Sequence, residues 1–170
     1  MRYFLTRLTE SHPVHAFTSG TRPGAAEIDA YLRTSALTEQ SAGLSTVWVA
    51  EDPNATQDDA VIVGYFTLSP VVVRISPAVT AAFDLPPVPY AAVGGYLLGR
   101  LGVASNRQGQ GYGAALVAAA RKKALALRAE GGGVFLVVDP KNAELAAWYE
   151  RLDFGFRRLD AKHPRLVLKL

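Results

Sequence analysis

The sequence predicts a single mixed α+β domain, and three observations support this prediction. Segments rich in β-branched and aromatic residues alternate with segments of helical periodicity along the chain. The chain has 170 residues, 49% of them hydrophobic, which is enough for one core. No internal repeat, low-complexity block or long linker divides the sequence, so we expect residues 1–170 to form one domain.

The N-terminal half predicts three strands and a long helix. The strands are expected at residues 2–8, 45–51 and 60–69. The second and third strands flank the polar stretch DPNATQDD and therefore predict an antiparallel hairpin. Apolar residues recur at helical intervals over residues 25–42 and predict an amphipathic helix. Several prolines and a glycine pair in residues 70–95 predict a connection that holds one short helix.

The C-terminal half predicts strands and helices in alternation. Strands are expected at residues 96–104, 134–139 and 165–170, and helices at residues 112–130 and 143–152. Three consecutive glycines, residues 131–133, close the first of these helices.

Composition excludes several kinds of chemistry. The sequence has no cysteine, which excludes a disulfide, a thiolate nucleophile and a cysteine-based zinc site. His12 and His15 flank Pro13, which breaks the helix that would align them as ligands, so no metal is expected. No apolar run approaches ~20 residues and no apolar segment follows Met1, so we expect a cytoplasmic protein that does not bind membranes. The net charge of +3 is compatible with an anionic cofactor or with nucleic acid.

Glycines crowd the start of the helix at 112–130 and predict a loop that binds phosphate, because anions approach the free amides of a helix N-terminus. A P-loop is excluded, since no Lys-Ser/Thr pair follows the last glycine. Gly109, Gly111 and Ala114 match the dinucleotide pattern G-x-G-x-x-A. However, four residues separate this pattern from the strand, and too few βαβ units follow. The third interpretation is an acyl-CoA site, which depends on the motifs that follow.

Two motifs resemble signatures of the GNAT superfamily of N-acetyltransferases. The first is QGQGYG at residues 108–113, a Q-x-x-G-x-G pattern, and the second is NAELAAWYERLDF at residues 142–154. The resemblance implies a GNAT fold, in which a mixed, mostly antiparallel sheet splays between two adjacent parallel strands and is flanked by helices. It also implies acetyl-CoA (CoA) as co-substrate. Asp153 stands where the family usually has glycine, and we expect it to end the helix in a left-handed conformation.

The resemblance also implies a role for each part of the site. Amides of the glycine loop would bind the pyrophosphate, and backbone groups of the preceding strand would pair with the acetyl and pantetheine arm. The expected cofactor-binding residues are Leu101, Val103, Gln108, Gly109, Gln110, Gly111, Tyr112, Gly113 and Asn142. Tyr149 is the expected catalytic residue, a general acid for the leaving thiolate. Its alternative role is packing in the core.

The N-terminal half is similar to the GNAT branch of toxins that acetylate the α-amino group of aminoacyl-tRNA and are inhibited by a ribbon-helix-helix antitoxin. The similarity is carried by Phe17, Ser19, Gly20, Asp29, Tyr31 and Leu32. It extends to Arg100, which we expect to bind the acceptor substrate. Further basic residues, Arg33, Arg74, Arg107 and those of residues 121–128, would add a sequence-independent field for RNA. Alternatively, Arg100 pairs with a carboxylate and the other residues are ordinary surface charges.

Three functions stay open from the sequence. The protein acetylates aminoacyl-tRNA as the toxin of a toxin–antitoxin pair, acetylates a small-molecule or protein amine, or binds CoA or a partner without turnover. Acetyl-CoA, aminoacyl-tRNA, an antitoxin and a second copy of the chain are the partners considered.

Overall fold

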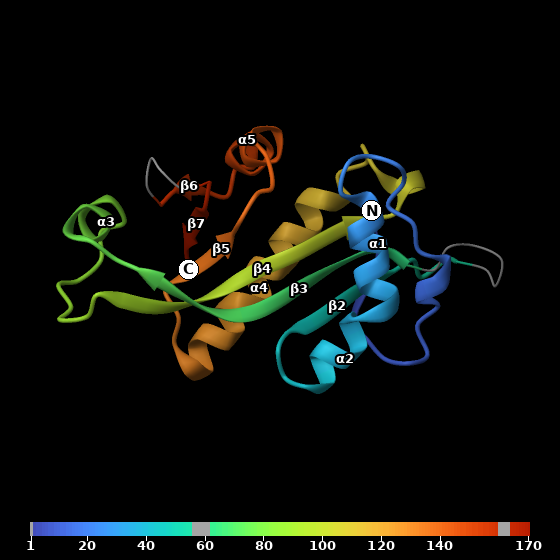
Figure 1. The fold of residues 1–170 in the computed structure, drawn as a ribbon, viewed down its shortest axis with the longest axis horizontal. Helices are drawn as coiled ribbons and strands as arrows, with labels where there is room; N and C mark the ends of the chain where they lie inside the picture. Colours follow the sequence, from blue (N-terminus) through green and yellow to red (C-terminus); the bar gives the residue numbers. More distant parts are fainter. Residues whose placement is uncertain (1, 56–61, 160–163) are drawn as a thin grey trace. The chain divides into compact units, whose positions relative to one another are not determined.

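The computed structural model describes residues 2–55, 62–159 and 164–170 (Figure 1). Within these residues, seven strands form one sheet in the order β1-β2-β3-β4-β5-β7-β6. The strands are β1 (Phe4–Arg7), β2 (Thr46–Glu51), β3 (Ile62–Arg74), β4 (Ala92–Val103), β5 (Phe135–Val138), β6 (Arg157–Arg158) and β7 (Leu166–Lys169). The α-helices are α1 (Ala25–Thr34), α2 (Ala36–Ser41), α3 (Pro77–Ala82), α4 (Tyr112–Gly131) and α5 (Ala143–Arg151), and Val14–Ala16 (η1) and Ser105–Arg107 (η2) are short 3-10 helices.

The sheet is mixed. Strands pair antiparallel in β1–β2, β2–β3, β5–β7 and β6–β7, whereas β4 and β5 are parallel. The predicted α+β class, with a mostly antiparallel sheet that contains one parallel pair, is therefore confirmed.

Two compact units divide the chain, and their boundaries fall inside β3, β4 and α4. The first unit comprises Met1–Ser69 and Gly99–Ala120, and the second comprises Pro70–Leu98 and Arg121–Leu170. Each unit is described separately below.

In the first unit, the sheet has α1 on one face and the beginning of α4 on the other. Gly64 and Tyr65 are consecutive in β3 and therefore face opposite sides of the sheet. A Cβ at Gly64 would lie 2.7 Å from Leu116 Cδ1 of α4. The Tyr65 hydroxyl donates a 2.7 Å hydrogen bond to the Ile28 carbonyl of α1. The buried cluster around α1 consists of Leu8, Phe17, Tyr31, Leu32, Ala36, Val47, Val49, Ile62, Tyr65 and Ala104.

In the second unit, α3 is attached through Phe83. This side chain is 3% exposed and meets the ring of Phe135 edge-on, with the ring centroids 5.2 Å apart. Lys169 Nζ donates to the carbonyls of Phe83 and Asp84 at 2.9 and 2.8 Å. Because these carbonyls end the helix, the ammonium group stabilises its negative pole.

The helix expected over residues 25–42 is interrupted. It divides into α1 and α2 at Ser35, where φ is −120° and ψ is −30°. The preceding Thr34 donates its hydroxyl to the Ala30 carbonyl at 2.8 Å. Hydroxyl side chains that compete for backbone groups weaken a helix at such positions, which explains the break.

Two other expectations differ from the structure, and one short strand was not expected. The connection expected over residues 70–95 is shorter, because β3 continues through Pro70 to Arg74 and β4 begins at Ala92. Proline is tolerated in a strand where its missing N–H is not needed, and Pro70 is exposed. The left-handed residue after α5 is Gly155, with φ of 86°, rather than Asp153, since glycine adopts this conformation without a Cβ clash. Strand β6 has only two residues, too few for a sequence pattern to predict.

Replacing Phe83 by alanine tests the attachment of α3. We expect Phe83→Ala to lower the free energy of unfolding by about 3–5 kcal/mol, because a buried aromatic side chain leaves a cavity. Urea denaturation measures this change. Val72→Ala is the matched control, since Val72 is 68% exposed and its loss should be nearly neutral. Equal effects of the two substitutions would contradict the role assigned to Phe83.

Candidate functional site

The residues expected to form the site fall into two groups, one in each unit. The first unit holds Arg100, Leu101, Val103 and the glycine loop, which is defined here as Gln108–Gly113. The second unit holds Asn142 and Tyr149. The structure therefore places the strand and the glycine loop that are expected to bind the donor in one compact unit, and the expected general acid in the other.

Strand β4 directs the backbone groups of Leu101 and Val103 away from β3. The N–H groups of Arg100 and Ala104 both donate to β3, to Thr67 Oγ1 and to the Val63 carbonyl, each at 3.0 Å. Because successive N–H groups of a strand point to opposite edges, those of Leu101 and Val103 point to the other edge. Pairing with β5 runs only from Gly95 to Leu97 of β4. The two N–H groups thus lie beyond the last residue pair of that ladder.

Two glycines of the glycine loop adopt a left-handed backbone conformation before α4 begins. Gly109 and Gly111 have φ of 74° and 85°, which residues with a Cβ rarely adopt. A Cβ at Gly109 would meet no atom within 4 Å, so the space over the loop is open. Helix α4 starts at Tyr112, and its first N–H groups have no partner inside the helix. Exposed amides, open space and a helix N-terminus together fit a pyrophosphate.

Side chains of the glycine loop serve the protein itself. Gln108 Nε2 donates to the carbonyls of Ser19 at 2.7 Å and Val103 at 3.1 Å, which uses both of its hydrogens. Gln110 Nε2 donates to the Asn106 carbonyl at 2.9 Å. Tyr112 is buried, and its ring centroid lies 6.4 Å from that of Tyr3. What these residues offer to a ligand is therefore mainly their backbone.

Arg100 is exposed and lies over an aromatic ring. Its guanidinium carbon is 4.0 Å from the centroid of the Tyr31 ring, which is a cation–π contact. The Tyr31 hydroxyl donates to Glu39 Oε2 at 2.8 Å, and burial raises the pKa of this tyrosine. The ring thus holds the Arg100 side chain while leaving its charge exposed.

Two other arginines proposed for an RNA-binding field are already engaged. Arg107 Nη2 is 2.6 Å from Asp52 Oδ2. Arg33 Nη2 donates to the Phe17 carbonyl and lies 3.9 Å from Asp29 Oδ2. Their charges are largely balanced by these acceptors, so in the first unit Arg100 is the better candidate for contacting an anionic acceptor.

Tyr149 lies on α5 between two aromatic rings. Its ring centroid is 4.8 Å from that of Trp148 and 5.5 Å from that of Phe156, and the side chain is 5% exposed. Burial strongly raises the pKa of the Tyr149 hydroxyl, because the phenolate would lose its hydration. The phenol therefore stays protonated at neutral pH and can donate a proton.

Asn142 begins the helix that carries Tyr149. Its Oδ1 accepts the Leu145 N–H at 2.8 Å, so its side chain is the N-cap of α5. This role explains the asparagine at the start of the second motif without any ligand. Its Nδ2 group is the part left for the CoA contact that the sequence predicted.

The structure adds three residues that could support the site and to which the sequence assigned no role: Ser19, Asp29 and Thr67. All three are buried polar residues of the first unit. The pattern F-x-S-G followed by an aspartate identified the first two, but not what they bind. Nothing in the sequence marks Thr67, which accepts the Arg100 N–H in place of a main-chain carbonyl.

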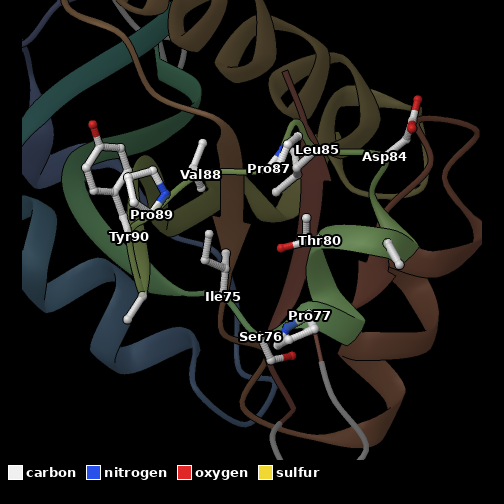
Figure 2. Close-up of a pocket in the computed structure, with 12 residues that line it drawn as sticks. Ile75, Ser76, Pro77, Thr80, Asp84, Leu85, Pro87, Val88, Pro89 and Tyr90 are labelled. Atoms are coloured by element: carbon white, nitrogen blue, oxygen red, sulfur yellow. The ribbon is translucent and has the colours of Figure 1, made fainter.

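A separate cavity of about 620 Å³ lies in the second unit, between α3 and the proline-rich segment that follows it (Figure 2). Its lining includes Ile75, Thr80, Leu85, Val88 and Tyr90. The charged residue among the lining residues is the acidic Asp84, so the cavity does not suit a phosphate. None of the residues expected in the site lines it.

The described residues meet neither the requirements of a metal site nor those of a membrane-spanning helix. His12 bonds to the hydroxyls of Thr9 and Thr6 at 2.8 and 3.1 Å. The described ranges contain no group of three side chains able to hold a metal ion. No helix in the same ranges is both long and apolar enough to cross a bilayer.

Comparisons with known proteins agree with this fold. The model of the acetyltransferase (GNAT) family matches residues 14–156. AtaT complexed with acetyl-methionyl-tRNAfMet is 21% identical with a TM-score of 0.80, over 99% of this chain and 95% of that chain. A tyrosine-to-phenylalanine mutant of KacT is 22% identical with a TM-score of 0.81, over 99% and 95%. A tyrosine-to-phenylalanine mutant of the AtaT toxin, bound to the C-terminus of the antitoxin AtaR and acetyl-CoA, is 19% identical with a TM-score of 0.74, over 98% and 92%.

The glycine loop can be tested with a pair of matched glycines. Gly109 and Gly43 both have φ of 74° and open space at the Cβ position. Substitution by alanine should cost each about 1–2 kcal/mol of stability, because the left-handed conformation is strained. We expect only Gly109→Ala to weaken CoA binding as well, by about tenfold, since its methyl group enters the open space over the loop and would keep the pyrophosphate from about one amide.

Isothermal titration calorimetry with CoA measures the binding, and thermal denaturation measures the stability. Equal CoA affinity of the two variants would remove the glycine loop from the candidate site.

Proposed function

The chain belongs to the GNAT family of acetyltransferases, and on that premise we propose that it acetylates the α-amino group of aminoacyl-tRNA as the toxin of a toxin–antitoxin pair. Membership makes the protein an acyltransferase, and the GNAT family uses acetyl-CoA. The acceptor, the antitoxin and the role of each site residue are the proposal.

Backbone groups carry the donor side of the proposal. Acetyl-CoA brings an acetyl group activated as a thioester. The amides of the glycine loop hold its pyrophosphate, and Leu101 and Val103 hold its arm from the strand edge that faces away from β3. The Val103 N–H polarises the thioester carbonyl and stabilises the negative charge that develops on its oxygen.

Tyr149 supplies the proton for the departing sulfur. As the amine forms its bond to the carbonyl carbon, the bond from carbon to sulfur breaks and the phenol donates its proton to the thiolate. The raised pKa of Tyr149 supports this role, because the acid is fully protonated before each turnover. Solvent reprotonates the phenolate, and the proton of the attacking amine passes to water.

The exposed guanidinium of Arg100 is the observation that carries the acceptor side. It follows Gly99 on the strand that holds Leu101 and Val103, and the Tyr31 ring fixes it by a 4.0 Å contact. A fixed, exposed cation beside the donor strand suits a phosphate near the 3′ end of a charged tRNA. The similar fold of AtaT, solved with acetyl-methionyl-tRNAfMet, and of AtaT with AtaR supports the choice of acceptor and of partner.

An acceptor assay tests the proposed function. The purified protein receives radiolabelled acetyl-CoA and a bulk pool of aminoacyl-tRNA, with deacylated tRNA as control. Label on the charged tRNA alone is the expected outcome. Label that appears instead on polyamines, amino acids or protein N-termini in parallel reactions would replace the tRNA acceptor with another amine.

Tyr149→Phe removes the proposed acid and keeps the aromatic packing. We expect kcat to fall about 10²-fold or more, while KM for acetyl-CoA stays within about twofold. Steady-state kinetics at saturating acceptor measures both values. The control is Tyr90→Phe, since Tyr90 is 65% exposed and lines the separate cavity of Figure 2. An unchanged kcat for Tyr149→Phe would show that this residue only packs.

The pH profile gives a second test of Tyr149. The pKa of Tyr149 is raised above the ordinary value of about 10, so the phenol should stay protonated below about pH 10. The wild-type kcat should therefore show no decline from loss of this acid in that range. A decline of kcat with an apparent pKa near 8 that disappears in Tyr149→Phe would contradict the assignment.

Arg100→Gln tests the acceptor contact. We expect KM for charged tRNA to rise about tenfold and the slope of log KM against log salt to fall by about one, as for one lost phosphate contact. KM for acetyl-CoA should not change. Arg7→Gln is the matched control, because it removes an exposed cation from β1 of the same unit. Equal effects of the two variants would show that Arg100 acts only through the net charge of the protein.

A further inference from the structure

We infer that Asp29 is a positioning residue for the glycine loop, acting through Ser19 and Gln108. The inference concerns residues that no ligand needs to touch. It rests on the proposed function only in assuming that the glycine loop binds acetyl-CoA.

Asp29 holds Ser19 by two hydrogen bonds. The Ser19 N–H and hydroxyl donate to Asp29 Oδ1 at 2.9 and 2.6 Å. Both residues are 7% exposed, so the carboxylate has little water around it. Hydrogen bonds to a buried carboxylate are short and strong, and Ser19 is therefore fixed relative to α1.

Ser19 in turn holds the start of the glycine loop. Its carbonyl accepts Gln108 Nε2 at 2.7 Å, and the other hydrogen of the same nitrogen goes to the Val103 carbonyl at 3.1 Å. The carboxamide of Gln108 thus links the segment around Ser19 to the end of the donor strand. A continuous hydrogen-bonded chain runs from Asp29 on α1 to Val103 on β4.

The backbone around Ser19 has further attachments. The Thr18 carbonyl accepts the Ser105 N–H at 2.8 Å, and the Thr18 hydroxyl accepts the Gly20 N–H at 3.2 Å. The peptide between Ser19 and Gly20 is therefore held at its N–H by Thr18 and at its carbonyl by Gln108. Phe17, 1% exposed, anchors the segment in the core.

The chemistry of residue 29 decides how firmly this arrangement holds. An asparagine has the same shape and could still accept from Ser19, but without the negative charge. Its amide nitrogen would replace the oxygen that lies 3.9 Å from the Arg33 guanidinium. Loss of attraction on both sides would loosen Ser19, and Gln108 would lose a fixed acceptor. The glycine loop would then sample other conformations, and its amides would have to be ordered again on binding.

Two measurements on Asp29→Asn test the inference. Hydrogen–deuterium exchange over residues 105–113 needs no ligand, and we expect it to accelerate about tenfold as local opening becomes easier. The dissociation constant for acetyl-CoA, measured by calorimetry, should rise about tenfold. At saturating acetyl-CoA, kcat should stay within about twofold of wild type.

Tyr65→Phe separates positioning from general stability. It deletes a 2.7 Å hydrogen bond between β3 and the same helix α1, but leaves the chain from Asp29 to Val103 intact. We expect it to lower stability without changing exchange in the glycine loop or acetyl-CoA affinity. Equal loosening of the loop in Tyr65→Phe would overturn the inference, because α1 stability alone would then account for it.

Gln108→Glu breaks the chain at its other end and serves if Asp29→Asn does not fold. The new carboxylate would face the carbonyls of Ser19 and Val103, so loop exchange and the acetyl-CoA dissociation constant should both rise. Gln40→Glu is its control, since Gln40 bonds the Leu8 carbonyl and the Val47 N–H at 2.8 and 3.0 Å within the same unit. Similar effects of the two glutamates on the loop would also overturn the inference.

The outcomes distinguish the inference from the proposed function. If wild-type protein does not bind acetyl-CoA, the proposed function fails, and exchange in the glycine loop still decides whether Asp29 positions it. If wild-type protein binds acetyl-CoA and Asp29→Asn matches it in exchange and affinity, only the inference fails.

Discussion

The alternation of backbone groups along β4 is the constraint on which the first unit depends. One set of N–H groups must pair with β3, and those of Arg100 and Ala104 do so. The alternate set, at Leu101 and Val103, is then directed to the other edge by the geometry of the strand. No side chain is needed to create hydrogen-bond donors there. Close packing at Gly64, whose Cβ would lie 2.7 Å from the Gly102 carbonyl, keeps β3 and β4 in register at this point.

The glycine loop leaves its amides exposed at the expense of rigidity. Two left-handed glycines in three residues give an exposed backbone that contributes no side-chain packing of its own. Neighbouring residues must therefore order it. Gln108 performs this function with a single nitrogen, and the Ser105 N–H adds a second attachment through Thr18. The first glutamine of the Q-x-x-G-x-G motif is thus explained by two main-chain acceptors, which an amide satisfies and a carboxylate cannot.

Local signals in the sequence predicted most of the elements, the family and the glycine loop. The strand and helix patterns and the two motifs are local, and the GNAT family they indicated is confirmed. What the sequence did not predict depends on long-range contacts or on competition between close alternatives. The strand expected to end before Pro70 continues to Arg74, and Gly155 takes the left-handed conformation that was expected of Asp153. The role of Asn142 as the N-cap of α5 and the chain from Asp29 to Val103 became visible only in three dimensions.

The break at Ser35, which the sequence did not predict, has a consequence for Arg100. In a continuous helix, Tyr31 and Glu39 would lie about 12 Å apart along the axis, since each residue rises about 1.5 Å. The turn at Ser35 brings them together, so that the Tyr31 hydroxyl bonds Glu39 at 2.8 Å. The ring is also stacked on Tyr65, with the centroids 6.5 Å apart. Held at its hydroxyl and on one face, Tyr31 offers a fixed surface to the Arg100 guanidinium. The proposed donor contacts therefore depend on backbone geometry, whereas the proposed acceptor contact depends on side chains of α1 and α2.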